Sequence, residues 1–450
     1  MLRLGHIMEG PGASWVDWRH PDAEPGSMYN IEWLRRRAQL CEAAKFDFIF
    51  VADSVYVTTK SAPYSLSRLE PVTMMSALAM VTRHIGLAAT VTATYTEPFN
   101  VARLFGSLDQ ISGGRAAWNL VTSFTDDSGL NFGADGLPSH DLRYRMADDH
   151  LEVVQKLWDS WEDDAMVHDK GRGLYIDSAK VHTIDHAGPF YRVKGPLNMV
   201  RSPQGQPVIF QAGASEAGRD FAARRADCVF VAPTSREEAK AYYDDMKRRA
   251  RLAGRDPDRL LIIPSMAPYI GSTDAEGKAR WVERADLMDL EGALAWVSKF
   301  LNQLDLGQFD LDAPFPRDLI ERNFEGYQTV LNRMAQMLDD TPNLTLRQLA
   351  QRMATKTSEF MGAPETIADT MQDWFESRLC DGFMVGESHT SPMPLFCHEV
   401  VPILQRRGLF RADYEGRTLR ENLGLPRPAN RFARSGGPRV EAAPVGRGSA

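Results

Sequence analysis

Two short stretches of this chain carry side chains of the kind that bind anions. In the first, His140-Asp141-Leu142-Arg143-Tyr144, an imidazole and a phenol are four residues apart. If the stretch is helical, His140 and Tyr144 lie on one face, and both can donate hydrogen bonds to phosphate oxygens. Taken alone, His140 is better interpreted as a solvated loop residue.

The second stretch is Gly213-Ala214-Ser215, which comes immediately before residues predicted to be helical. The first backbone N–H groups of a helix have no partner within it, and together with the helix dipole they favour an anion at that end. Ser215 would serve equally well as an ordinary helix cap. The pattern by itself therefore leaves both interpretations open.

A third set of polar side chains follows buried strands. Asp53 and Ser54 come directly after the apolar run 46–52, where they form either a ligand contact or a simple turn. The others are three alternating threonines and an asparagine: Thr90, Thr92, Thr94 and Asn119. Because α/β proteins place their chemistry at the carboxyl ends of parallel strands, this set is a candidate site.

The stretch 85–123 indicates how these side chains are positioned. Residues 85–94 are β-branched or small and predict a strand, whose alternation puts the threonines on one face. A helical pattern follows, with Asn100 as the expected N-cap and Gly113 at its end. Residues 116–121 predict a second strand, so the stretch is a βαβ unit with parallel, adjacent strands.

The same alternation runs through most of the chain. Eight strands, each followed by helical sequence, are expected near Leu4, Ile49, Ala89, Asn119, Ile209, Phe230, Ile262 and Met384. Eight repeats favour a closed (β/α)₈ TIM barrel of α/β class, with an open doubly wound sheet as the alternative. We expect one domain over residues 1–425, with insertions at about 125–203 and 271–361 covering the barrel mouth. From Pro426 onward the composition predicts a poorly ordered tail.

Composition and missing motifs exclude several classes of protein. A formal net charge of -8 argues against nucleic acid and anionic membranes as partners. The four cysteines show no CxxC spacing and read as reduced thiols of a cytoplasmic protein. There is no apolar run of membrane-spanning length, no Walker A loop, no GxGxxG after the first strand and no GxSxG elbow.

A metal site is not expected either. His182 and His186 have metal-like spacing, but Gly188 and Pro189 follow and no third ligand is evident. The residues alone thus indicate a cytosolic barrel enzyme that binds a phosphate-bearing ligand.

Longer motifs extend this interpretation. Among them are EPFNVARLFGSLDQISGGRAAWNLVTS at 97–123, HDLRYRMADDHLEVVQKLW from His140, and GPLNMVRSPQGQPVIFQAGAS ending at Ser215. In these motifs the chain resembles the bacterial-luciferase-like flavin monooxygenases. It is most similar to the group of nitrilotriacetate monooxygenase component A, EDTA monooxygenase and dibenzothiophene-sulfone monooxygenase. The motifs span nearly the whole chain.

The resemblance implies a luciferase-like barrel that uses reduced FMN, supplied by a separate NAD(P)H-dependent flavin reductase, and O2 to oxygenate a small organic substrate. It implies a homodimer or homotetramer and no metal, and it names no catalytic residue. The flavin contacts that it implies are Ser54, Thr90, His140, Tyr144 and Ser215. Two alternatives remain: a deazaflavin-dependent hydride-transfer oxidoreductase of the same barrel superfamily, and a flavin-binding protein without turnover.

Overall fold

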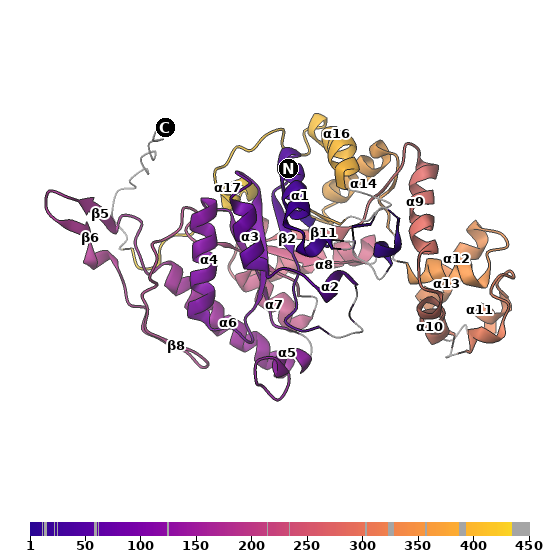
Figure 1. The fold of residues 1–450 in the computed structure, drawn as a ribbon, viewed down its shortest axis with the longest axis horizontal. Helices are drawn as coiled ribbons and strands as arrows, with labels where there is room; N and C mark the ends of the chain where they lie inside the picture. The colour runs from indigo at the N-terminus through magenta and orange to yellow at the C-terminus, as the bar shows by residue number, and fades with distance from the viewer. Residues whose placement is uncertain are drawn as a thin grey trace.

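The computed structural model describes residues 1–10, 12, 16–21, 23–24, 26–57, 61, 63–123, 126–213, 215–233, 235–301, 304–322, 328–355, 358–386 and 393–433. Its centre is a closed barrel of parallel strands in the order β1-β14-β11-β10-β9-β4-β3-β2 (Figure 1). The strands are β1 (Arg3–Ile7), β2 (Phe48–Val51), β3 (Gly86–Thr92), β4 (Ala116–Val121), β9 (Val208–Gln211), β10 (Cys228–Val231), β11 (Leu261–Met266) and β14 (Gly382–Val385). All lie where the sequence predicts them, which confirms the (β/α)₈ barrel. The pairing of β1 with β14 closes the sheet and excludes the open alternative.

Each strand alternates between the barrel interior and the surrounding helices. On β2, Phe48 and Phe50 belong to the interior cluster, whereas Ile49 packs outward against the helices. Inside the barrel the Phe48 and Phe210 rings lie 4.8 Å apart, and those of Phe50 and Phe230 lie 4.6 Å apart. The barrel is therefore filled by an aromatic core, and a ligand must bind at one of its ends.

A short C-terminal helix closes the amino end of the barrel. Leu419 and Leu423 of α17 (Leu419–Leu423) join the interior cluster from below the strands. Arg420 donates through Nη2 to Oδ2 of Asp227 at 2.9 Å and through Nε to the Gln206 carbonyl at 2.8 Å. With that end occupied, the carboxyl end of the strands is left as the mouth.

Helices surround the strands in the expected alternation. They are α1 (Ile31–Ala43), α3 (Pro71–Ala79), α4 (Pro98–Ser112), α6 (His140–Trp158), α7 (Glu216–Arg225), α8 (Arg236–Leu252), α14 (Pro364–Glu376) and α16 (Val401–Arg406). The predicted N-cap of α4 was wrong: the helix begins at Pro98 with Glu97 as N-cap, and Asn100 lies in its first turn. A proline suits the first helical position because its φ is already set. Gly113 ends the helix at φ 70°, as predicted.

The first enlarged connection, between β4 and β9, contains two parts. One is α5 (Asp126–Leu130) with the start of α6. The other is a pair of antiparallel hairpins, β5 (Met166–Asp169) with β6 (Leu174–Ile176) and β7 (His186–Ala187) with β8 (Arg192–Val193). In Figure 1 the β5–β6 hairpin projects from one side of the barrel. Asn131 Nδ2 donates to the Val55 carbonyl at 2.8 Å, so this connection also reaches the loop after β2.

The second enlarged connection is helical. It contains α9 (Asp274–Asp286), α10 (Leu290–Phe300), α11 (Asp318–Arg322), α12 (Gln328–Asp340) and α13 (Leu346–Ala354). Helices α10 to α13 enclose a hydrophobic cluster of their own and stand apart from the barrel, on the side opposite the hairpins (Figure 1). The chain enters and leaves this connection through the paired strands β12 (Tyr269–Ile270) and β13 (Met361–Gly362).

The C-terminal segment begins with residues that are bound rather than free. Arg427 forms two hydrogen bonds to Asp163, at 2.7 and 2.6 Å, and Asn430 Nδ2 donates to the Asp159 and Trp161 carbonyls, each at 2.8 Å. The expected start of the tail at Pro426 was therefore too early, because these polar side chains find partners on the first enlarged connection. Residues 434–450 lie outside the described residues.

Candidate functional site

Small, exposed residues lie at the mouth on three strands: Ala212 directly after β9, Ala232 directly after β10, and Ser265 as the next-to-last residue of β11. Below them the half-buried Phe230 ring lies against Phe50 and forms an apolar floor. A ligand placed here would meet apolar groups below and polar strand ends at the side. This is the arrangement expected at the carboxyl end of a barrel.

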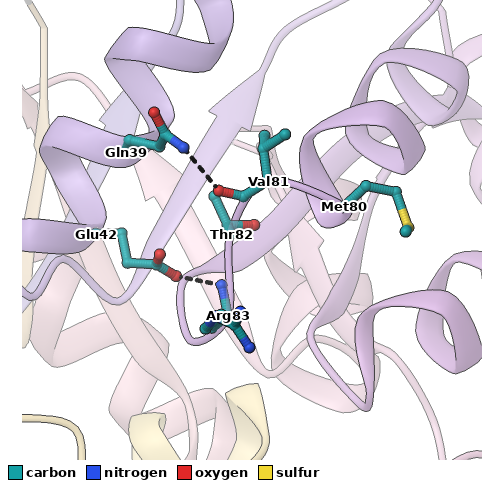
Figure 2. Close-up of a pocket in the computed structure, with 6 residues that line it drawn as sticks. All are labelled: Gln39, Glu42, Met80, Val81, Thr82 and Arg83. Carbon is teal, nitrogen blue, oxygen red and sulfur yellow. Dashed lines mark hydrogen bonds between the residues drawn. The ribbon is translucent and has the colours of Figure 1, made fainter. Parts of the chain in front are cut away.

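A surface pocket lies at the other end of the barrel (Figure 2). It is lined by Gln39, Glu42, Met80, Val81, Thr82 and Arg83. Glu42 Oε1 accepts the Arg83 N–H at 2.7 Å, and Gln39 Nε2 donates to the Val81 carbonyl at 3.1 Å (Figure 2). Because these residues precede β3, the pocket is remote from the strand ends, and its polar groups satisfy the backbone of a loop. We do not place the candidate site there.

His140, Tyr144 and Ser215 come together at the mouth. His140 is the first residue of α6, and its Nε2 lies 3.1 Å from Ser215 Oγ at the start of α7. The rings of His140 and Tyr144 lie 5.0 Å apart on one helix face. His140 lies in a helix and not, as the residues alone had suggested, in a loop, but its side chain is 45% exposed. Ser215 caps α7, accepting the Gly218 N–H at 3.2 Å, which confirms the cap interpretation.

Gly218 makes this approach possible. A Cβ atom at Gly218 would lie 2.7 Å from Tyr144 Oη, 3.0 Å from Gly213 Cα and 3.1 Å from Ser215 Oγ. Only a residue without a side chain leaves the phenol and the hydroxyl free at that distance. Three potential donors and the N-termini of two helices thus lie side by side, an arrangement suited to a phosphate.

Two further residues hold the turn before Ser215. The buried Tyr242 of α8 donates to the Gly213 carbonyl at 2.9 Å, and burial raises the pKa of Tyr242 to about 12. Gln211, 2% exposed, lies beneath Gly213, and its Oε1 has no partner in the described part of the chain. Neither residue was predicted from the sequence. Gln211 carries a usable signal, a polar residue ending a buried strand, whereas nothing near Tyr242 indicates its distant partner.

Thr90 and Asn119 form a second polar group, on β3 and β4. Asn119 Nδ2 donates to Thr90 Oγ1 at 2.9 Å, and Thr90 Oγ1 donates to the Val51 carbonyl at 2.6 Å. Since the threonine proton is used, Thr90 Oγ1 can only accept, whereas Asn119 keeps its second Nδ2 hydrogen as a donor. Asn119 Oδ1 is buried and unpartnered among the described residues. Beside them, Thr92 Oγ1 lies 2.9 Å from Ser123 Oγ.

Ser54 lies at the end of β2, where its Oγ donates weakly to the Tyr56 carbonyl at 3.4 Å. The described contacts join neither Ser54 nor Thr90 to the His140, Tyr144 and Ser215 group. The structure therefore brings together three of the five predicted contacts, and places Thr90 on β3 and Ser54 in the loop after the neighbouring strand β2.

Asp53, next to Ser54, gives a testable pH dependence. Burial raises its pKa to about 6, against the opposing charge of Arg68, whose Nε lies 3.6 Å away. A carboxyl with a raised folded-state pKa stabilises the fold at low pH, and this stabilisation is lost as pH rises from about 4 to 6. We expect the free energy of unfolding of Asp53→Asn to change between pH 4 and 7 by about 2 kcal/mol less than that of wild type. Urea denaturation at pH 4 and 7 measures it, and an unchanged pH dependence would contradict the assignment.

The two histidines with metal-like spacing have separate partners. His182 Nε2 lies 2.8 Å from Glu162 Oε1, and His186 Nε2 lies 2.9 Å from Asp149 Oδ1. Among the described residues no group of three metal-ligating side chains occurs, and no helix is long and apolar enough to span a membrane. All four cysteines are buried and free.

Known proteins match nearly the whole chain. Residues 13–381 match the family model of luciferase-like monooxygenases. N-acetyl-S-(2-succino)cysteine monooxygenase of Bacillus subtilis is 41% identical and covers 96% of this chain and 98% of its own. Nitrilotriacetate monooxygenase component A of Aminobacter aminovorans is 41% identical with the same coverages.

Solved structures agree with these matches. EDTA monooxygenase from Chelativorans sp. BNC1 superposes with a TM-score of 0.75 at 30% identity, covering 95% of this chain and 98% of its own. Long-chain alkane monooxygenase superposes with a TM-score of 0.77 at 33% identity, covering 94% and 95%. Both the sequence and the fold are thus similar to those of monooxygenases with different substrates.

Proposed function

Because the chain belongs to the luciferase-like monooxygenases, we propose that it is the oxygenase of a two-component system. In this proposal it takes reduced FMN from a separate NAD(P)H-dependent flavin reductase and uses O2 to oxygenate a small organic substrate. That the chain is a monooxygenase follows from relatives about 40% identical over nearly its full length. The observation that carries the FMN proposal is the 3.1 Å approach of His140 to Ser215, beside Tyr144.

The residues present fit FMN. His140, Tyr144 and Ser215 would hold the phosphate, in the space that a Cβ atom on Gly218 would obstruct. Asn119 Oδ1, buried and unpartnered among the described residues, offers an acceptor to an N–H group of the ring system, with Thr90 on the adjoining strand β3 and Ser54 in the loop after β2. This fit supports FMN over a flavin without a phosphate.

When bound, reduced FMN supplies the electrons that activate O2 for transfer of an oxygen atom to the substrate. The protein's contribution is binding, orientation and exclusion of water. The Phe50 and Phe230 rings provide an apolar floor that excludes water from below. The proposal assigns no general base.

A reductase-coupled assay tests the function. The purified chain alone should not oxidise NADH, since its sequence has no dinucleotide-binding fingerprint. With a flavin reductase, FMN and a substrate, we expect oxygenated product. Steady NADH oxidation without reductase would contradict the two-component proposal. Hydride transfer with a deazaflavin and no O2 would favour that alternative, and flavin binding without product from any of a broad substrate panel would favour a carrier.

We also propose a homodimer or homotetramer. Most apolar residues of α3 pack onto the barrel, but Met80 just after it is 75% exposed, and Leu104 and Ile111 on the adjacent α4 are 47% and 51% exposed. Sedimentation at micromolar concentration should show at least a dimer, and a monomer would contradict the proposal. Leu104→Lys should weaken assembly about tenfold or more, whereas Leu252→Lys, at a site that is 76% exposed on α8, should not.

A further inference from the structure

Arg143 lies in the first turn of α6, directly before Tyr144, but its side chain binds elsewhere. It is 9% exposed, and its guanidinium donates to backbone carbonyls only. Nε donates to Pro138 at 3.0 Å, and Nη1 donates to Thr122 at 3.2 Å and to Ser123. Arg143 therefore ties the start of α6 to the end of β4.

The charge of Arg143 has no counter-ion within the part of the chain that the structure describes. Of the five other buried arginines, four are each paired with an aspartate: Arg201, Arg284, Arg411 and Arg420. The fifth, Arg115, lies at the amino end of the barrel and, like Arg143, donates to uncharged groups. Arg143 pairs with none, and no hydrogen bond from its Nη2 occurs among the described residues. A partly desolvated positive charge without a carboxylate favours an anion nearby, and the candidate phosphate site begins three residues away at His140.

Arg143 also supports the strand ends. Its partner Ser123 has φ 56°, in the left-handed region that residues other than glycine seldom adopt. Ser123 Oγ lies 2.9 Å from Thr92 Oγ1, and the Thr94 hydroxyl donates to the Thr122 carbonyl at 2.8 Å. The guanidinium thus binds a strained backbone segment on which the polar ends of β3 and β4 depend.

We propose that Arg143 is a positioning residue for FMN, with two effects. It fixes His140 and Tyr144 relative to the ends of β3 and β4, so that the phosphate and ring contacts keep the correct separation. It also adds a positive charge at the phosphate-binding end of α6. This inference rests on the proposed function, because it requires a flavin that carries a phosphate.

Two substitutions separate the effects. Arg143→Gln removes the charge and should lower the ratio of FMN to riboflavin affinity by about tenfold. Arg143→Lys keeps the charge but loses the planar fork of the guanidinium. Its ratio of FMN to riboflavin affinity should therefore stay close to that of wild type, while both flavins bind more weakly. The Kd values are measured for each flavin by fluorescence quenching at two salt concentrations, and the salt dependence of FMN binding should be smaller in the glutamine variant.

Arg115 provides the matched control. It is 2% exposed, and its guanidinium likewise donates to backbone carbonyls, such as those of Ser112 and Ile85, but at the amino end of the barrel. Arg115→Lys should destabilise the fold without changing the affinity ratio.

Two outcomes would overturn the inference and leave the proposed function standing. One is that wild type prefers FMN and Arg143→Gln keeps that preference; the other is that Arg143→Lys binds both flavins like wild type. If wild type shows no preference for FMN, the proposed phosphate site itself fails. If Arg143→Gln does not fold, the flavin affinities of Arg143→Lys alone test the inference.

Discussion

Gly218→Ala is expected to weaken FMN binding by about ten- to a hundredfold. The added Cβ atom would meet Tyr144 Oη at 2.7 Å and displace the phenol from the space assigned to the phosphate. Hydrogen bonds to charged groups contribute roughly 1.5–3 kcal/mol each, which sets the expected loss of affinity. The added Cβ atom would also lie 3.0 Å from Gly213 Cα, so the free energy of unfolding of this variant is measured beside its FMN affinity.

Gly292→Ala is the control for this substitution. Gly292 occupies the same position in α10 as Gly218 in α7: its N–H is accepted by the N-cap side chain of Asp289 at 2.8 Å. Among the described residues, its added Cβ atom would meet only Asp289 Oδ2, at 3.3 Å. This variant should bind FMN like wild type. Titration with FMN and a urea denaturation curve for each variant provide the comparison, and unchanged FMN affinity in Gly218→Ala would refute the assigned phosphate position.

Asp17→Ala should produce the largest loss of stability. Arg284 of α9 donates to both Asp17 carboxylate oxygens, at 2.6 and 2.7 Å, and to Tyr269 Oη at 2.7 Å, with Asp17 only 2% exposed. Removing one partner of a buried ion pair typically costs about 3–5 kcal/mol, because the remaining charge is left buried. The pair joins the loop after β1 to the helical connection, so we expect α9 to detach from that loop.

Glu32→Ala is the corresponding control, because Glu32 pairs with Arg35 on the surface of α1. Exposed pairs contribute about 0–1 kcal/mol. Urea denaturation followed by circular dichroism compares the two variants. A loss below about 1 kcal/mol for Asp17→Ala would show that other contacts hold α9 to the barrel. The preference for FMN over riboflavin should survive, because β1 pairs with neither β4 nor β9, the strands that precede His140 and Ser215.

The barrel could be predicted from sequence because each strand is a short buried run with its own local signal. The β-branched and small residues of 85–94, ended by a helix and a pair of glycines, predict a βαβ unit without knowledge of distant contacts. A local sequence signal predicts the wrong boundary where two nearby residues could each begin the helix. Asn100 is a good capping residue, yet Pro98 two residues earlier begins the helix. The tail likewise looked free by composition, although Arg427 and Asn430 find partners on a remote segment.

Part of the candidate site was predictable, because its residues also carry local sequence signals. His140 and Tyr144 have the spacing of one helix turn, and Ser215 precedes a predicted helix. Their convergence could not be derived from spacing, because 75 positions separate Ser215 from His140. The resemblance to the luciferase-like family suggested it. Tyr242 donates to the Gly213 carbonyl and Arg143 to the Thr122 carbonyl, both distant in sequence. Because every residue has a backbone carbonyl, such a partner cannot be recognised from the sequence.

The FMN-to-riboflavin affinity ratio tests the central claim most directly. Wild type, Ser215→Ala and Ser235→Ala are titrated anaerobically with each reduced flavin. Ser235 is the matched control because it caps α8 as Ser215 caps α7, accepting the Glu238 N–H at 3.2 Å. We predict that wild type and Ser235→Ala bind reduced FMN about ten- to a hundredfold more tightly than reduced riboflavin, and that Ser215→Ala loses most of this preference. Equal affinity of the wild type for both flavins would contradict the account.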